Sequence, residues 1–280
     1  MKSLHVYDYN IPGTHNTCNC QPSLQCDDFD ERYEEFKKLI IDLVATKSSK
    51  TFYKFSDGEY LWWKNVQNGS VAPGRRDSNI IDRDLTPFRE GILKCDYNGI
   101  NLHPDDYINF KEVFNKEPDF LVDHATGLIY NKWWTETFNG QIGLIGGDAK
   151  MDLIAELCGH QEYLDYLKFD GFTDYIKLPQ RYLCDQIDYA EELLAEQLTK
   201  SSSKVFLIGI GHAQQALLHR MKYYTDALFV VVGSGICAYA GVQDNRRPYA
   251  AEWTNYQLKD YDYTKIDIWR ENFTNKKIIG

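Results

Sequence analysis

The chain has 280 residues, of which 43% are hydrophobic, 26% charged and 14% aromatic, and 41 acidic against 31 basic side chains give a net charge of −10. This composition supplies a sizeable core and excludes a disordered or collagen-like chain. The acidic balance excludes a global positive field for nucleic acid or an anionic membrane surface, so any phosphate site must be local.

The first 27 residues are rich in Asn, Thr, Cys and Pro and show no periodicity, which predicts an irregular leader. They lack the apolar core of a signal peptide, and the apolar run Ala227–Val242 is shorter than the roughly 20 residues that span a bilayer. We therefore expect a cytoplasmic protein without membrane insertion, in which residues 28–280 form a single domain. The sequence leaves a homo-oligomer open.

The seven cysteines are an odd number, which favours reduced thiols over a disulfide framework. Three of them lie in the leader, near a histidine, and the spacing of this group matches no common zinc finger. Free thiols are expected there, and metal binding is left open. The group consists of His15, Cys18, Cys20 and Cys26.

An amphipathic helix is predicted from Phe29 to Val44, where apolar residues recur at helical spacing and acidic residues gather near the start. The β-branched and aromatic segment Thr51–Phe55 predicts a strand. This strand stops at Ser56-Asp57-Gly58, and a helical run follows from Glu59 to Trp63. A strand, a sharp turn and a helix are thus expected in that order.

Residues 65–83 contain turn dipeptides and no period, which predicts a long surface loop, a kind of segment that often serves as a functional lid. Helices are predicted near 84–95 and 105–116. Strands and helices then alternate in the order Ile142–Gly147, Ala149–Cys158, Tyr175–Leu178, Asp185–Thr199, Lys204–Gly209, Ala213–Tyr223 and Ala227–Val232. This alternation predicts a Rossmann-like α/β fold: a mostly parallel sheet with helices on both faces and ligands at the carboxyl ends of its strands.

The segment after the first strand carries the most informative chemistry. Asp57 and Glu59 are two positions apart around Gly58, which lets the backbone turn closely around a ligand. Magnesium and manganese prefer oxygen ligands and are commonly shared between one or two carboxylates and the phosphates of a substrate. A structural reading competes, because Asp-Gly is a common turn dipeptide and Glu is common in the first turn of a helix.

Two glycine turns follow apolar strands and precede helices, where free backbone N–H groups attract anions. They are Gly146-Gly147-Asp148 and Gly209-Ile210-Gly211-His212. The second turn begins like a dinucleotide fingerprint, but Gln214 stands where its third glycine would be. Tight packing between strand and helix explains such glycines as well as nucleotide contact does.

Other side chains are candidates mainly by their chemical type, and a structural role is the more common alternative for each. Histidines at predicted strand or loop ends are candidate diphosphate ligands or acid–base groups, arginine pairs are candidate phosphate clamps, and tryptophan pairs are candidate stacking platforms. These residues are His124, His212, Arg75, Arg76, Arg246, Arg247, Trp62, Trp63, Trp133 and Trp134.

The segment Lys54-Phe55-Ser56-Asp57-Gly58-Glu59 resembles the Arg-Phe-Gly-Asp-Gly-Glu-like hallmark of the bacterial GT-D-type glycosyltransferases. The order of later features is also similar: a tryptophan-containing helix before a strand, a strand that runs into Pro179-Gln180-Arg181, and the turn Ile208–His212 in place of a Leu-Gly-Pro-like turn. The resemblance covers about residues 30–245 and implies a GT-D-like fold.

The resemblance implies a metal-dependent glycosyltransferase that moves a sugar from a nucleotide diphosphate donor, with uridine favoured, to a hydroxyl of a glycan or glycoprotein. It implies that Asp57 and Glu59 are the catalytic pair and hold Mn²⁺ or Mg²⁺. The expected donor-binding residues are Lys54, Ser56, Gly58, Asp148, Gln180, Arg181, Gly209, Gly211 and His212. The donor sugar, the stereochemical outcome and the catalytic base are left open.

Two other functions remain as alternatives. A Rossmann-like enzyme that uses NAD or S-adenosylmethionine would bind through Gly209 and Gly211, although its fingerprint is incomplete. A carbohydrate-binding module without turnover would bind glycans independently of metal and nucleotide.

Overall fold

The structure, a computed structural model, describes residues 29–55, 58–60, 84–101, 104–241, 258 and 260–266. The predicted leader, the predicted loop at 65–83 and the cysteine and histidine group at 15–26 lie outside the described residues. So do both arginine pairs and Trp62-Trp63, and the single-domain prediction for residues 28–280 stays a prediction. In the described part, no helix is long and apolar enough to cross a membrane.

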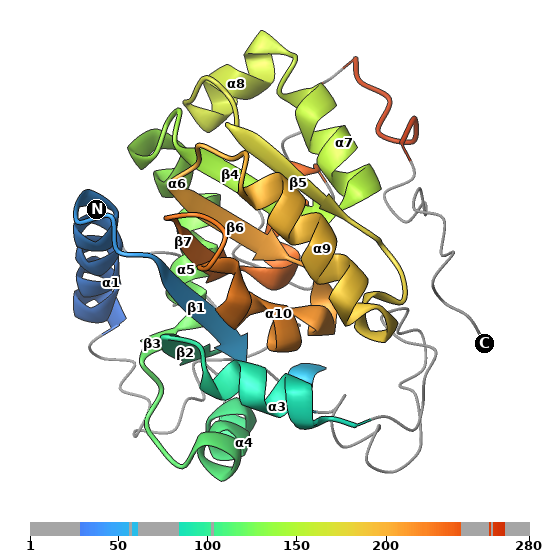
Figure 1. Cartoon of the computed structure of the whole chain (residues 1–280). Helices are drawn as coiled ribbons and strands as arrows, with labels where there is room; N and C mark the ends of the chain where they lie inside the picture. The colour runs from blue at the N-terminus through green and yellow to red at the C-terminus, as the bar shows by residue number, and fades with distance from the viewer. Residues whose placement is uncertain are drawn as a thin grey trace.

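The described strands form one parallel sheet of seven strands in the order β3-β2-β1-β7-β6-β4-β5. The arrows of β1 and β6, for example, point the same way in Figure 1. The strands are β1 (Lys50–Phe55), β2 (Tyr97–Ile100), β3 (Phe120–Leu121), β4 (Ile142–Gly147), β5 (Asp174–Leu178), β6 (Val205–Gly209) and β7 (Leu228–Val231). This confirms the Rossmann-like α/β class.

The three innermost strands of the second half, β4, β6 and β7, are almost entirely buried. Strands covered by helices on both faces need continuous apolar sequence, and these strands have it. The helices are α1 (Phe29–Ala45), α3 (Thr86–Leu93), α4 (Pro104–Phe114), α5 (Val122–Tyr130), α6 (Trp133–Thr137), α7 (Asp148–Leu157), α8 (Gln161–Leu167), α9 (Ile187–Leu198), α10 (Gln214–Met221) and α11 (Ile236–Tyr239). The predicted helices that lie wholly within the described residues are confirmed, with ends that differ by at most two residues. Of the predicted helical run Glu59–Trp63, only residues up to 60 are described.

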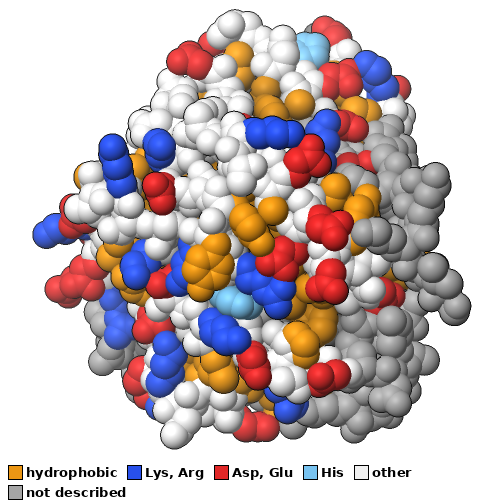
Figure 2. Space-filling view, viewed as in Figure 1, with side chains coloured by type: hydrophobic (Ala, Val, Ile, Leu, Met, Phe, Trp, Pro, Cys, Tyr) orange, Lys and Arg blue, Asp and Glu red, His pale blue; other side chains and the backbone are white. Residues whose placement is uncertain are grey.

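The two faces of the sheet carry different helices. Helices α3, α9 and α10 lie over the front face in Figure 1, with α10 packed between the other two. On the opposite face, Phe36 of α1 stacks on Phe120 and meets the ring of Phe52 edge-on. The front face in Figure 2 shows acidic and basic side chains interspersed over its described part, as expected for a chain without a global positive field.

Glycine sets the closest approach between α3 and α10. A Cβ atom on Gly91 of α3 would lie 2.1 Å from the backbone oxygen of Gln215 and 3.1 Å from the Cα atom of Ala216. Because these neighbours are backbone atoms, no rotamer change can make room for a methyl group. The position of α10 relative to the sheet therefore depends on a glycine in another helix.

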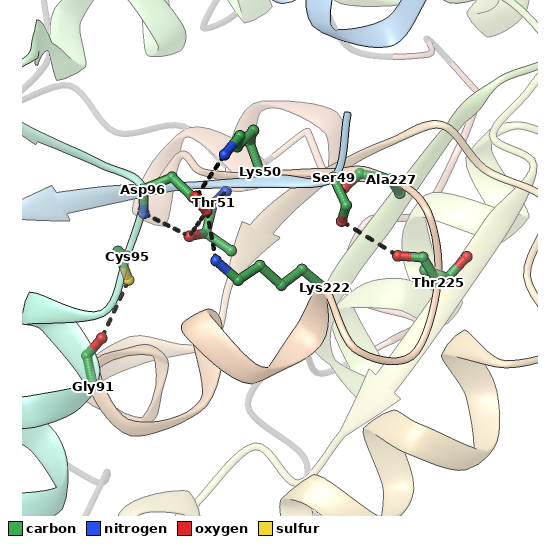
Figure 3. Close-up of polar contacts among 9 residues, drawn as sticks. All are labelled: Ser49, Lys50, Thr51, Gly91, Cys95, Asp96, Lys222, Thr225 and Ala227. Carbon is green, nitrogen blue, oxygen red and sulfur yellow. Dashed lines mark hydrogen bonds and ion pairs between the residues drawn. The ribbon is translucent and has the colours of Figure 1, made fainter. Parts of the chain in front are cut away.

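At the amino end of β1, the carboxylate of Asp96 joins three elements (Figure 3). It accepts hydrogen bonds from the Thr51 backbone N–H and hydroxyl at 3.0 and 2.9 Å, and from the ammonium groups of Lys50 and Lys222 at 3.0 Å each. Burial alone would raise the pKa of the Asp96 carboxyl, but the hydrogen bonds from Lys222, Lys50 and Thr51 together hold it below its usual value.

We expect Asp96→Asn to lower the free energy of unfolding by about 2 kcal/mol, because it replaces charge-assisted hydrogen bonds with neutral ones. The native pKa is depressed, so the carboxylate's contribution is complete above its unfolded pKa of about 4 and is lost as the pH falls through the native value. Urea unfolding at pH 7 and pH 3 measures this. Glu90→Gln, which removes only the exposed ion pair with Lys94, is the control; equal effects of the two variants at pH 7 would contradict the prediction.

Candidate functional site

The candidate site lies at the carboxyl edge of the sheet, where the connections of two neighbouring strands leave in opposite directions. After β6 the chain goes back to β7, whereas after the neighbouring β4 it continues outward to β5. Neighbouring parallel strands whose connections depart in opposite directions form a switch point, the usual ligand position in such sheets. Gly146 of β4 pairs with Gly209 of β6, so both predicted glycine turns begin at this point.

Glu59 lies at the same edge, just beyond the end of β1. A helical turn covers residues 58–60, and Glu59 is 7% exposed within it. Its Oε2 atom lies 3.6 Å from the Nζ atom of Lys54, whose side chain is 12% exposed, and its Oε1 atom accepts a hydrogen bond from Gln214 Nε2 at 3.3 Å. A nearly buried carboxylate is costly unless it is paired, and here it has a partner at each oxygen.

Tyr53 adds a neutral hydroxyl to this group. Its side chain is fully buried, and none of the described residues forms a hydrogen bond with its hydroxyl. Burial, followed by the negative charge of Glu59, raises the pKa of Tyr53 well above its usual value. Tyr53 is therefore a phenol, never a phenolate, at any physiological pH.

Two glycines make the turns that close this edge. Gly211 after β6 and Gly233 after β7 have φ values of +61° and +55°, in the left-handed region that L residues with side chains adopt at a cost. A Cβ atom on Gly233 would lie 3.4 Å from Cδ of Lys54, so the lysine stem lies against the turn that follows β7. These turns bring the ends of β1, β6 and β7 together around Lys54 and Glu59.

The remaining glycines at this edge are accounted for by packing within the protein. A Cβ atom on Gly146 would lie 2.7 Å from Cε of Met151, one on Gly147 would lie 1.8 Å from Oε1 of Gln180, and one on Gly209 would lie 2.7 Å from the backbone oxygen of Gly233. Contact of these turns with a nucleotide stays a prediction.

The other predicted donor residues lie further along the same edge. Asp148 is the first residue of α7 and is 3% exposed, and His212 is 2% exposed in the 3-10 turn Gly211–Ala213. Gln180 lies on Gly147, and the nearby 3-10 turn Leu183–Asp185 contacts the turn that holds His212. Arg181 is partly exposed beside Gln180. Ser56 and Asp57 lie outside the described residues, so the Asp57 half of the predicted pair has no described geometry.

Two candidates named for their chemical type belong to the core. The ring of His124 on α5 lies 5.7 Å from that of Tyr33 and 6.2 Å from that of Phe36, both on α1. Trp134 is fully buried and donates its indole N–H to the backbone oxygen of Ala125. His124 and Trp134 thus pack among apolar residues of the rear layer.

Two residues at this edge are not predicted from the sequence. Gln214 stands where a dinucleotide fingerprint has its third glycine, and in the structure its amide contacts Glu59. Lys150 of α7 is 7% exposed and donates a hydrogen bond to the Sγ atom of Cys237 on α11 at 3.2 Å. The one sequence feature that could have indicated Gln214 and Lys150 is that each is a polar residue in the first turn of a helix that follows a buried strand.

The donor atoms at Glu59 suit a hard divalent cation. A carboxylate oxygen is the ligand that Mg²⁺ and Mn²⁺ prefer, and Mg²⁺ sites often take one or two carboxylates and complete their shell with water and substrate phosphates. The described residues contain no cluster of three or more His, Cys, Asp or Glu side chains that would hold a metal alone. The chemistry of this site therefore fits a cation shared with a substrate.

Known proteins were compared with this chain by family model, by sequence and by structure. No protein-family model matches it, and no curated protein matches it in sequence. Among solved structures, it is similar to one described as a new glycosyltransferase (DUF1792) from Streptococcus sanguinis, with a TM-score of 0.44 and 12% identity over 70% of this chain and 79% of that one.

Proposed function

We propose that this protein is a metal-dependent glycosyltransferase that uses a nucleotide diphosphate sugar, with a uridine-linked donor favoured, and a hydroxyl of a glycan or glycoprotein as acceptor. The observation that carries the proposal is the nearly buried Glu59 carboxylate at the end of β1, which lies against Lys54 and next to the turn that follows β6. The Asp57-Gly58-Glu59 motif supports the same chemistry from the sequence.

The chemistry is electrostatic. When the anomeric bond to the donor breaks, negative charge develops on the departing diphosphate. Mn²⁺ or Mg²⁺, held by Asp57 and Glu59, would neutralise part of this charge. Lys54 holds a positive charge 3.6 Å from Glu59, so its ammonium group is placed to bind a phosphate oxygen beside the carboxylate. The backbone N–H groups of the turns after β4 and β6 would bind the remaining phosphate oxygens.

A thermal-shift panel tests the proposal. UDP, GDP, CMP, NAD and S-adenosylmethionine are each added with Mn²⁺ or with EDTA. A ligand at 100 times its Kd stabilises the native state by about 2.7 kcal/mol, which for a chain of this size raises Tm by about 5–10 °C. We expect a shift with UDP and Mn²⁺ that EDTA abolishes.

The other outcomes of this panel separate the alternatives. A shift with GDP that requires Mn²⁺ would keep the transferase and change the donor nucleotide. A metal-independent shift with NAD or S-adenosylmethionine would overturn the proposal in favour of a Rossmann-like enzyme of another class. A glycan-induced shift that is indifferent to nucleotide and metal would identify a binding module.

A further inference from the structure

The side chain of Gln214 contacts Glu59 from a distant part of the chain. The two residues are 155 positions apart, and the Nε2 atom of Gln214 lies 3.3 Å from the Oε1 atom of Glu59. An ionised carboxylate only accepts hydrogen bonds, so the amide must present its NH₂ group to Glu59. Gln214 is 2% exposed, which removes competition from bulk water.

The position of this amide is fixed by the fold. Gln214 is the first residue of α10, immediately after the turn that Gly211 makes with its positive φ. The next residue, Gln215, has its backbone oxygen against Gly91 of α3, so α10 cannot slide freely over the sheet. The amide that donates the hydrogen bond to Glu59 therefore belongs to a packed helix and not to a loop.

The carboxylate of Glu59 is therefore oriented at both oxygens, by the Gln214 amide at Oε1 and by the Lys54 ammonium 3.6 Å from Oε2. Polar groups that orient a metal-binding side chain in this way typically change metal affinity or activity by 10–100-fold when they are removed.

We infer that Gln214 is a positioning residue, which holds the Glu59 carboxylate in the orientation that binds the divalent cation. The inference rests on the proposed function, because it assumes that Glu59 is a ligand. A purely structural hydrogen bond between α10 and the turn at 58–60 would contribute to stability and leave metal affinity unchanged, so the two roles give different results.

The test uses the full chain in the presence of UDP, because the proposed cation is shared with the phosphates of the donor. Free Mn²⁺ is measured by electron paramagnetic resonance during titration, and a titration without protein gives the Mn²⁺ that UDP binds by itself. Gln214→Met keeps the length and bulk of the side chain and removes its polar atoms. The matched control is Gln197→Met on α9, which removes an amide that hydrogen-bonds the backbone of Lys177 and Leu193. We expect Gln214→Met to weaken Mn²⁺ binding by about 10–100-fold and Gln197→Met to leave it unchanged. Glu59→Gln should abolish binding.

The outcomes separate this inference from the proposed function. If Gln214→Met binds Mn²⁺ as the wild type does while Glu59→Gln does not, the positioning role is overturned and the metal site stands. If wild type fails to bind Mn²⁺, or Glu59→Gln binds it normally, both are overturned. Thermal unfolding in EDTA shows whether each variant folds. Should Gln214→Met not fold, Gln214→Asn, which keeps the amide but is too short to reach Glu59, must give the same loss of affinity.

Discussion

Glu59→Gln is expected to lower metal-dependent glycosyl transfer by about 10²–10³-fold, the loss typical when one group that stabilises developing charge is removed. Glutamine has nearly the same shape as glutamate but no charge, so the cation loses an anionic ligand and Lys54 loses the carboxylate 3.6 Å from its Nζ atom. The measurement is nucleoside diphosphate release from a panel of nucleotide sugars, with Mn²⁺ and with EDTA. Asp57→Asn should have an equally large effect.

The control is a second carboxylate close by. Glu112 of α4 accepts a hydrogen bond from the hydroxyl of Tyr60 at 2.7 Å, one residue away from Glu59, but at an exposed position. Glu112→Gln should keep wild-type turnover. Wild-type turnover in both Glu59→Gln and Asp57→Asn would remove the basis of the transferase assignment.

Gly91→Ala is expected to lower the free energy of unfolding by about 2–3 kcal/mol, although alanine favours helices over glycine by about 1 kcal/mol. The new methyl group would lie 2.1 Å from the backbone oxygen of Gln215, and only separation of α3 from α10 relieves that overlap. For a chain of this size the loss lowers Tm by about 5–10 °C, which calorimetry measures.

The same separation should weaken Mn²⁺ binding, because α10 carries Gln214 away from Glu59. Glu90→Ala, at an exposed neighbouring position in α3, is the control for adding alanine to that helix and should change Tm by no more than 1–2 °C, about 0.5 kcal/mol. An increase in Tm for Gly91→Ala would show that helix propensity outweighs the close packing and would contradict the prediction.

Three strands of the second half, β4, β6 and β7, were predictable because each is a short, buried apolar run. The predicted strand Ile142–Gly147 has the observed bounds, β6 begins one residue later than predicted, and β7 is one residue shorter than predicted at each end. Continuous apolar sequence is what a strand needs when helices cover both of its faces. The order of the strands in the sheet, by contrast, could not be predicted from any single segment.

The sequence did not predict β2, and the reason is its Asn98-Gly99 pair, which is typical of a turn. The glycine serves a different purpose: a Cβ atom there would lie 2.6 Å from the ring of Phe120 on the next strand. The lack of space for a side chain at Gly99 can be recognised only when the pairing of β2 with β3 is known. The short strand β3 and helix α5, which follows it without a loop, were missed as well.

The candidate site was predictable only where it depends on local sequence. The chemistry of Glu59 and Lys54 followed from a local motif, whereas the contact with Gln214 depends on the sheet order that brings β6 near β1. Local sequence indicates which residue types are present, but long-range pairing decides which of them meet. The role of Gln214 therefore depends on the fold and is not indicated by its own segment of sequence.

The place of β7 in the sheet has a consequence for how the chain folds. This strand pairs with β1 on one side and β6 on the other, and it comes last in chain order among the described strands. Until it has been synthesised, the β3-β2-β1 and β6-β4-β5 portions each present an unpaired apolar inner edge. Such edges are templates for aggregation, and pairings so distant in sequence form slowly. Ribosome-bound chains that end before Leu228 are therefore expected to depend on chaperones.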